Sequence, residues 1–378
     1  MTSPRDVFLH IGTMKSGTSY LQAVLKRNKT ALEQAGVFVP DRMVAAATDA
    51  LGKPGRRRTM ETRGEWPRVV SEIAAWQGDR VVASHEFLGA ATHEQADAIA
   101  ESLAPHRVTV IITARDLARV IPSHWQTVVK GAKTWLFAEY VGILLDEPGT
   151  QGAALRAHRG FWAHQDLARI TSAWCDTVGA ENVVVVTVPP SEAPPDLLWS
   201  RFAHVVGIDP AAYDHEPDST SNVSLSYGET EMLRQVNVLL GDRLGPVEYR
   251  SLVNNFFANK VLRDAPRQAA TRDRPALGPA SHARVSALAA EMVGTLRCSR
   301  VRVVGDLSEL EVAPFAGDPD VSESTPPQER VPDVVPYLIS QLLIELALAQ
   351  RKGGGSSDLP GEGRNAHRRD ARAARLGR

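Results

Sequence analysis

Cysteine is scarce in this chain: only Cys175 and Cys298 occur among its 378 residues. They lie far apart and match none of the spacings by which cysteines bind metal ions, so the sequence predicts no metal site. Two distant cysteines also cannot form the disulfide framework of a small secreted protein. We therefore expect both to be buried thiols in a reducing compartment.

The chain also lacks an excess of either charge. It has 43 lysines and arginines against 44 aspartates and glutamates, which gives a formal net charge of −1. Proteins that bind DNA or RNA usually carry a basic excess that attracts the phosphates. The sequence therefore predicts no nucleic-acid partner.

No apolar run is long enough to span a membrane. The best candidate, residues 334–349, falls short of the roughly 20 residues that a spanning helix needs, and Pro336, Gln341 and Glu345 interrupt it. We expect residues 334–350 to form an apolar helix that docks on the rest of the chain, without stable membrane insertion. The same helix is compatible with a homo-oligomer in which it contacts a second subunit.

The start of the chain contains no recognisable targeting segment. The first apolar run begins at Val7, which leaves too few residues before it for a signal peptide. We therefore expect a cytoplasmic protein.

What the chain does have is an alternation of apolar runs and helical patterns. The apolar runs are rich in Val and Ile, which is typical of strands buried on both faces of a parallel sheet. They are residues 7–11, 81–83, 108–114, 183–188 and 301–304. The helical patterns cover residues 18–27, 92–103, 123–130, 165–178 and 196–206. The alternation predicts an α/β fold of three layers, with a mostly parallel central sheet and helices on both faces.

The composition of the chain changes in three places. We expect a single domain over residues 1–313, with a long loop at about 43–66 where Ala, Gly, Pro and Arg mix. Residues 314–333, rich in Pro, Asp and Ser, predict a linker to the apolar helix at 334–350. Residues 351–378 begin with a Gly/Ser run and end in an Arg-rich stretch, which predicts a disordered tail.

The first apolar run leads into a loop of small polar residues. Gly12 and Gly17 have the spacing of the two glycines in a Walker A motif, but Thr18 stands where that motif has lysine, and Lys15 lies inside the loop. A strand, such a turn and a helix in that order predict a P-loop-like nucleotide site, because backbone N–H groups and the positive helix end point into the turn. The residues predicted to contact the anion are Thr13, Lys15, Ser16, Gly17, Thr18 and Ser19.

A second candidate anion site follows the apolar run at 108–114. Arg115 stands at the end of this expected strand, and its planar guanidinium suits bidentate binding of a phosphate. Pro is favoured in the first position of a helix, so Pro122 predicts a helix start. Ser123 then lies in the first helical turn, where backbone N–H groups without a helical partner attract anions.

Two residues that can accept a proton follow the strand expected to end at Ser84. They are His85 and Glu86. Strand alternation puts Ser84 and Glu86 on one face and His85 on the other, so we expect only one of the two to point into the cleft. We favour Glu86 as the catalytic base and keep His85 as the alternative.

These elements together resemble the sulfotransferases that use 3′-phosphoadenosine 5′-phosphosulfate (PAPS), a metal-independent family related to the P-loop kinases. The resemblance is carried by Lys15 to Thr18 after an apolar strand, and by Arg115 with Ser123 eight residues later. It implies that the loop, with Lys15 as a catalytic residue, holds the 5′ phosphosulfate and that Arg115 and Ser123 hold the 3′ phosphate. The cofactor is then PAPS, with no metal ion. The sequence Ser84-His85-Glu86 after a strand is similar to the branch of the family that acts on carbohydrates and lipids, where such a Glu is often the base. Because the late element of the cytosolic branch is missing, the chain resembles the bacterial and carbohydrate-type branches more than the cytosolic one.

The implied activity is transfer of a sulfuryl group from PAPS to a hydroxyl of a carbohydrate, lipid or small metabolite, by in-line displacement. One element of the cytosolic branch is missing: Arg351 to Gly353 lead into the tail instead of a Gly-Asp-Trp sequence. Closure over the 3′ phosphate must then come from elsewhere. The alternatives are a P-loop-type nucleotide-dependent kinase, with Asp116 as its metal-binding carboxylate, and a non-catalytic protein that binds adenosine 3′,5′-bisphosphate (PAP), the product.

Overall fold

The centre of the molecule is a six-stranded sheet in which every pair of neighbouring strands is parallel. The computed structural model describes residues 4–52, 62–146, 149, 151–216, 225–262, 274–316 and 334–352. The strand order is β2-β3-β1-β4-β5-β6. The strands are β1 (Asp6–His10), β2 (Val37–Phe38), β3 (Arg80–Ser84), β4 (Arg107–Ala114), β5 (Val183–Thr187) and β6 (Arg302–Val304). The expected α/β class is confirmed.

Helices cover both faces of this sheet, because alternate residues of each strand point to opposite sides and nearly all are apolar. Val7 and Leu9 of β1 face one apolar core, and Phe8 faces the other. The first core is closed by α3 (Met43–Ala50), α4 (Glu65–Ala75), α5 (His93–Ser102), α9 (Leu167–Val178) and the end of α14 (Pro279–Cys298). The second is closed by α1 (Thr18–Arg27), α2 (Lys29–Gln34) and α10 (Leu197–Val206). The fold therefore has the three layers that the sequence predicts.

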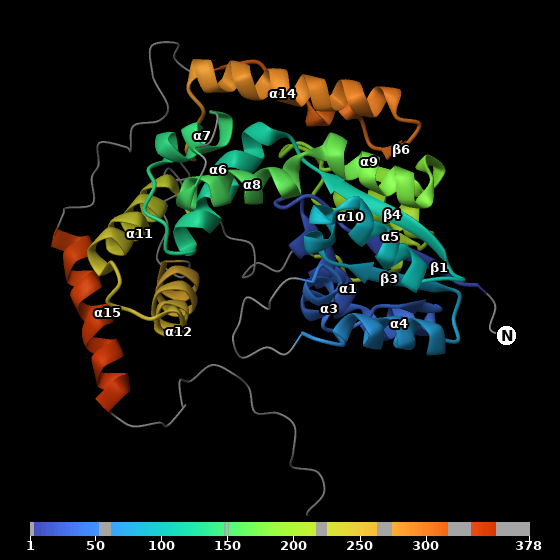
Figure 1. Ribbon diagram of the computed structural model, residues 1–378, viewed down its shortest axis with the longest axis horizontal. Coiled ribbons are helices and arrows are strands. Elements are labelled where there is room, and N and C mark those ends of the chain that lie inside the picture. The colour runs from blue at the N-terminus through green and yellow to red at the C-terminus, as the bar shows by residue number, and fades with distance from the viewer. Residues whose placement is uncertain are drawn as a thin grey trace, which may run out of the picture.

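A helical lobe with its own apolar core lies beyond the end of the sheet where α6 follows β4 (Figure 1). Trp125, Tyr140 and Phe161 are among its fully buried side chains. The lobe contains α6 (Leu117–Lys130), α7 (Phe137–Leu145), α8 (Gly152–Gln165), α11 (Tyr227–Leu240), α12 (Pro246–Glu248), the π-helical stretch η4 (Tyr249–Val261) and α15 (Val334–Lys352). The described residues also contain the short 3₁₀ turns η1 (Glu86–Ala90), η2 (Ala180–Asn182), η3 (Pro210–Ala212) and η5 (Leu307–Leu310).

The expected long loop at residues 43–66 is wrong over much of its length. Residues 43–50 form α3, and α4 begins at Glu65. Met43 and Ala46 pack into the core beneath β1 and β3, so burial of this Ala-rich segment outweighs its weak helical pattern. The Arg-rich part of the expected loop, residues 53–61, lies outside the described residues.

The expected start of α6 is also wrong. The helix begins at Leu117, because the Asp116 carboxylate accepts a hydrogen bond from the Arg119 backbone N–H at 2.9 Å and caps it. Pro122 therefore lies inside the helix, where it removes one intrahelical hydrogen bond. Ser123 falls in the second turn, and its backbone is not a free helix start.

The structure also corrects the expectations for the cysteines and for the C-terminal segment. Cys175 is half-buried, whereas Cys298 is exposed, so the expectation of two buried thiols fails for Cys298. Helix α15 includes residues 351 and 352, which were expected in the tail. Residues 353–378 of that tail and residues 317–333 of the expected linker lie outside the described residues. Among the helices that the structure describes, none combines the length and apolarity needed to cross a membrane.

Helix α15 packs along α11, at the outer edge of the lobe (Figure 1). Leu343 and Ala347 enter the lobe core, while Leu338, Leu342 and Leu346 remain exposed. The helix is therefore apolar on both its packed and its solvent-facing sides. This arrangement agrees with a helix that docks on the domain.

Two adjacent leucines of α15 test this docking. Leu343 is 3% exposed and Leu342 is 62% exposed. Leu343→Ala is expected to lower the free energy of unfolding by about 2–4 kcal/mol, because it leaves a cavity in the lobe core. The matched control Leu342→Ala should change it by less than about 0.5 kcal/mol. Urea unfolding measures both, and equal effects would contradict the docking of α15.

Candidate functional site

The candidate site lies where the direction of the chain's crossovers changes. Strand β1 sits between β3 and β4, and the carboxyl ends of strands at such a switch point form a ligand crevice in open α/β sheets. The loop after β1 continues beside β4, since the Ile11 N–H donates to the Ile111 carbonyl at 3.0 Å and the Thr13 N–H to the Thr113 carbonyl at 2.8 Å. The loop is thereby fixed to the centre of the sheet.

Glycines shape this loop at two points. A Cβ on Gly12 would lie 2.1 Å from Thr113 Oγ1, so a side chain does not fit between β1 and β4. Gly17 has φ +82°, in the left-handed region that glycine adopts without strain, and it caps α1. Lys15 has φ +68°, which is uncommon for a residue with a side chain. The loop thus reverses direction tightly just before α1.

The start of α1 presents several backbone donors. Within the described residues, the N–H groups of Gly17, Thr18 and Ser19 have no hydrogen-bond partner, and no side chain caps the helix. The positive end of the helix macrodipole lies at the same place. These groups can bind an anion, as the sequence predicts.

The side chains of the loop divide into two groups. Thr13 and Ser16 are buried, and their hydroxyls donate to the Thr113 carbonyl at 3.3 Å and the Thr13 carbonyl at 2.5 Å. Thr18 is buried at the helix start, and Ser19 is exposed. Thr13 and Ser16 therefore use their hydroxyls inside the protein and offer a ligand only backbone groups.

Lys15 is half-buried and lies among other charges. Burial lowers the pKa of its ammonium to about 8, and the neighbouring charges of Lys130 and Arg115 act in the same direction, whereas Glu86 acts against them. The charges of Arg115 and Glu86 are therefore close enough to Lys15 to act on it. The structure thus gathers the three regions that the sequence singles out.

Arg115 leaves the end of β4 with a partly buried guanidinium. Burial lowers its pKa to about 10, followed by the like charges of Arg119 and Arg274, with Asp116 acting against them. Its Nε atom is buried and has no hydrogen-bond partner among the described residues. Such a donor is costly to bury unless something accepts from it.

Asp116 is occupied. One carboxylate oxygen accepts from the Arg119 backbone N–H at 2.9 Å, and the other forms an ion pair with the Arg119 guanidinium. Arg119 in turn donates to the Pro189 carbonyl at 3.0 Å. Asp116 therefore holds α6 and Arg119 in place, which argues against its use as the metal-binding carboxylate of a kinase.

Helix α6 turns one face toward the loop. Lys130 interacts electrostatically with Lys15. Ser123 lies two helical turns before Lys130 and shares its face. Ser123 lies in the second turn of the helix and not at a free helix start.

The two candidate bases differ in their hydrogen bonds. His85 is buried, and its Nδ1 accepts from the Phe87 backbone N–H at 3.1 Å, so the neutral ring carries its proton on Nε2. Burial also lowers its pKa, with Glu86 acting against the shift. His85 therefore has no spare lone pair with which to take a proton.

Glu86 keeps an accessible carboxylate. Its side chain is 19% exposed, and Oε2 accepts from Gln22 Nε2 at 3.1 Å. Gln22 belongs to α1, so this contact holds the carboxylate beside the helix that follows the loop. The remaining lone pairs of the carboxylate are the better candidate acceptor for a proton.

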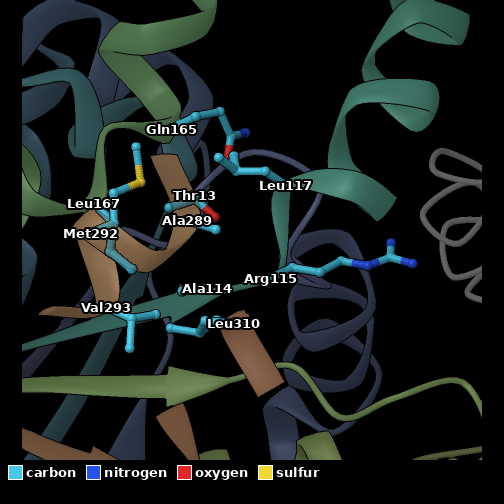
Figure 2. Close-up of a pocket in the computed structure, with 10 residues that line it drawn as sticks. All are labelled: Thr13, Ala114, Arg115, Leu117, Gln165, Leu167, Ala289, Met292, Val293 and Leu310. Carbon is cyan, nitrogen blue, oxygen red and sulfur yellow. The ribbon is translucent and has the colours of Figure 1, made fainter. Parts of the chain in front are cut away.

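A small, mostly apolar pocket lies beside the loop. Its polar lining comes from Thr13, Arg115 and Gln165, and Gln165 Nε2 donates to the Met14 carbonyl of the loop at 2.6 Å. Figure 2 shows the Arg115 side chain extending away from the other lining residues. The guanidinium therefore points out of this pocket.

Sequence reasoning does not single out Arg274. It is exposed and acts electrostatically on Arg115, far away in the chain. No local motif marks it, because only the folded chain brings the two together. Lys130 likewise lacks a motif, apart from its place on the Ser123 face of α6.

The comparisons with known proteins are sparse. No protein-family model matches the chain, and no curated protein matches it. A solved structure of a sulfotransferase from Alicyclobacillus acidocaldarius is similar, with 15% identity, a TM-score of 0.40, and coverage of 59% of this chain and 87% of that chain. A similarity of this size does not identify the activity of the present chain.

The charge cluster predicts a measurable effect on Lys15. Lys130→Gln is expected to raise the pKa of Lys15 above about 8, because it removes a neighbouring positive charge. NMR titration of the protein with ¹³Cε-labelled lysine measures this pKa. Lys29→Gln is the control, since Lys29 pairs with Asp41 at 2.6 Å. An unchanged pKa in Lys130→Gln would contradict the proximity of the two lysines.

Proposed function

We propose that this chain transfers a sulfuryl group from PAPS to a hydroxyl group of an acceptor. The observation that carries the proposal is the joint position of the Lys15 loop and Arg115 at the switch point of a parallel sheet. Two separate cationic groups, each partly buried, suit one ligand with two separate anionic groups. A nucleotide with a 5′ phosphosulfate and a 3′ phosphate has this charge pattern.

The residues of the site fit such a nucleotide. The backbone donors at the start of α1 and the ammonium of Lys15 would hold the 5′ end, with Thr18 beside them. Arg115, whose buried Nε has no partner among the described residues, would hold the 3′ phosphate, with Ser123 on the facing helix. Arg274 is a candidate for closure over that phosphate, because its charge acts on Arg115.

Electrostatics favour an anionic ligand here. Burial lowers the pKa values of both Lys15 and Arg115, and nearby positive charges lower them further: Lys130 and Arg115 act on Lys15, and Arg119 and Arg274 act on Arg115. An anion bound beside these cations would favour their charged forms and raise both pKa values again. With a pKa of about 8, Lys15 is still mostly protonated at pH 7 and can bind an anion.

Glu86 is the proposed base. Its carboxylate takes the proton of the acceptor hydroxyl as the oxygen–sulfur bond forms and the bond from sulfur to the 5′ phosphate oxygen breaks. The bound nucleotide supplies the sulfuryl group. Lys15 and the positive end of α1 neutralise the negative charge that develops on the departing phosphate. His85 supports the turn instead, through its bond to the Phe87 N–H.

The two alternative functions, a kinase and a non-catalytic PAP-binding protein, each require a different role for one residue of the site. A kinase needs a carboxylate for Mg²⁺, and Asp116 is engaged with Arg119. A non-catalytic PAP-binding protein needs Lys15 and Arg115 but not Glu86. The acceptor, whether carbohydrate, lipid or small metabolite, the bacterial or carbohydrate-type branch and the cytoplasmic location stay predictions from the sequence.

Calorimetric titration with PAP in the absence of metal tests the nucleotide site. Arg115→Ala is expected to weaken binding by about 10–100-fold, because a hydrogen bond to a charged group contributes about 1.5–3 kcal/mol. The control Arg107→Ala removes an exposed arginine at the opposite end of β4, which pairs with Asp6, and should leave the affinity unchanged. Tighter binding of Mg²⁺–ATP than of PAP would favour the kinase instead.

Turnover of PAPS with a panel of hydroxyl-bearing acceptors tests the base. Glu86→Gln should lower kcat by about 10²–10⁴-fold and leave PAP affinity unchanged. Lys15→Ala should lower kcat by about 10²–10³-fold. His85→Asn offers an oxygen in place of Nδ1 and should remain active. An active Glu86→Gln beside an inactive His85→Asn would make His85 the base, and PAP binding without any turnover would favour the non-catalytic alternative.

A further inference from the structure

We propose that His10 is a positioning residue, which joins the anion-binding loop to the strand end that carries Glu86 through one directed chain of buried hydrogen bonds. This inference rests on the proposed function of the same site. It concerns His10 on β1, Ser84 on β3, Thr113 on β4 and Ser16 in the loop, and we expect none of these side chains to contact the ligand.

His10 occupies the last position of β1, between the two neighbouring strands. Its side chain is fully buried. Nδ1 lies 2.8 Å from Ser84 Oγ at the end of β3, and Nε2 lies 3.1 Å from Thr113 Oγ1 near the end of β4. One imidazole thus spans all three central strands at the edge where the site lies.

The chain continues from β4 into the loop. Thr113 Oγ1 lies 2.8 Å from Ser16 Oγ, and the Ser16 hydroxyl donates to the Thr13 carbonyl at 2.5 Å. Thr113 and Ser16 are fully buried. Ser16 stands between Lys15 and Gly17, so this bond reaches the part of the loop with the unusual backbone.

The direction of every bond in this chain follows from counting protons. Ser16 has one hydroxyl proton and gives it to a carbonyl, which cannot donate, so Thr113 must donate to Ser16. Thr113 has then used its own proton and must accept from Nε2–H of His10. With its proton on Nε2, His10 can only accept at Nδ1, and Ser84 donates there.

A neutral ring with a single tautomer is essential to this chain. Burial lowers the pKa of His10 to about 3, and the nearby ring of His85 acts in the same direction. At neutral pH the imidazole is therefore uncharged, and the reverse arrangement of the protons would leave the 2.5 Å contact between the Ser16 hydroxyl and the Thr13 carbonyl without a proton.

The two ends of the chain reach the two functional parts of the site. At one end Ser16 fixes the loop turn that carries Lys15. At the other end Ser84 lies two residues before Glu86, and the His10 carbonyl also accepts from the His85 N–H at 2.9 Å. His10 therefore sets the position of the loop relative to the proposed base.

Two substitutions of His10 each remove one of its two side-chain hydrogen bonds and keep the other. In His10→Gln the terminal amide nitrogen can reach the place of Nε2 and donate to Thr113, but Ser84 loses its acceptor. In His10→Asn the amide oxygen takes the place of Nδ1 and accepts from Ser84, but Thr113 loses its donor. His10→Gln should keep PAP affinity within about threefold and lower kcat about tenfold. His10→Asn should weaken PAP binding about tenfold, since one buried hydrogen bond is worth about this factor.

Two substitutions of Thr113 form a second, matched pair of variants. Thr113→Val keeps the shape of the side chain and removes the hydroxyl, which breaks the chain in its middle. Thr113→Ser keeps the hydroxyl. We expect about tenfold weaker PAP binding for Thr113→Val and recovery to within threefold for Thr113→Ser, measured by calorimetry, with thermal melts to check folding. Equal affinities for Thr113→Val and the unaltered protein would overturn the inference.

The tautomer of His10 is an independent readout that needs no ligand. Two-bond ¹H–¹⁵N NMR correlation spectra of the full chain at pH 7 should show a neutral ring protonated on Nε2. A ring protonated on Nδ1, or on both nitrogens, would overturn the inference. If the tautomer is as expected but no PAP binds, the proposed function fails and the hydrogen-bond chain stands. If PAP binds but the Thr113 pair shows no difference, the function stands and the inference fails.

Discussion

Lys15 and Arg115 approach each other at the carboxyl edge of the sheet although both carry positive charge and both are partly removed from water. Burial removes hydration from each and lowers both pKa values; like charges lower them further, from Lys130 and Arg115 at Lys15 and from Arg119 and Arg274 at Arg115. The surrounding structure limits this cost with few counter-charges: Asp116 is used by Arg119, and Glu86 lies within reach of Lys15. An arrangement of this kind is stable enough to fold yet favours the arrival of an anion, and the proposed chemistry follows from that imbalance.

The other parts of the site fix the positions of Lys15 and Arg115 relative to each other. The sheet supplies the frame, because β1 lies between β3 and β4 and all three end at the same edge. The loop is attached to this frame from several directions: Thr113 through backbone and side chain, Gln165 through the Met14 carbonyl, and α10, whose Leu198 packs against Gly17. Arg169 does the same for the Glu86 segment, since it donates to the Gly89 and Ala91 carbonyls at 3.2 and 3.1 Å.

Sequence patterns predicted the strands and helices whose residues show a clear local periodicity. The strands around residues 7–11 and 108–114 and the helix at 18–27 were recognised, because buried parallel strands and an amphipathic helix leave clear periodicities. The start of α6 was missed because the Asp116 cap prevails over the signal of Pro122. Helix α3 was missed because its Ala-rich sequence is helical only through burial. His10 and Arg274 could not be assigned at all, since their partners are distant in the chain and only the folded sheet joins them.

The pairing of β1 has a consequence for how the chain folds. Asp6 is in register with both Arg80 and Arg107, so the central strand finds its neighbours only after long stretches of chain have been synthesised. Non-local parallel pairing of this kind is slow, because the entropy of closing a long loop is lost before the contacts form. The loop after β1 takes its shape only once both neighbours are in place, since its anchors Thr113 and Ile111 lie on β4. Recovery of the proposed nucleotide binding during refolding should therefore be a late event, and a chain caught before it would expose the apolar strands of its centre.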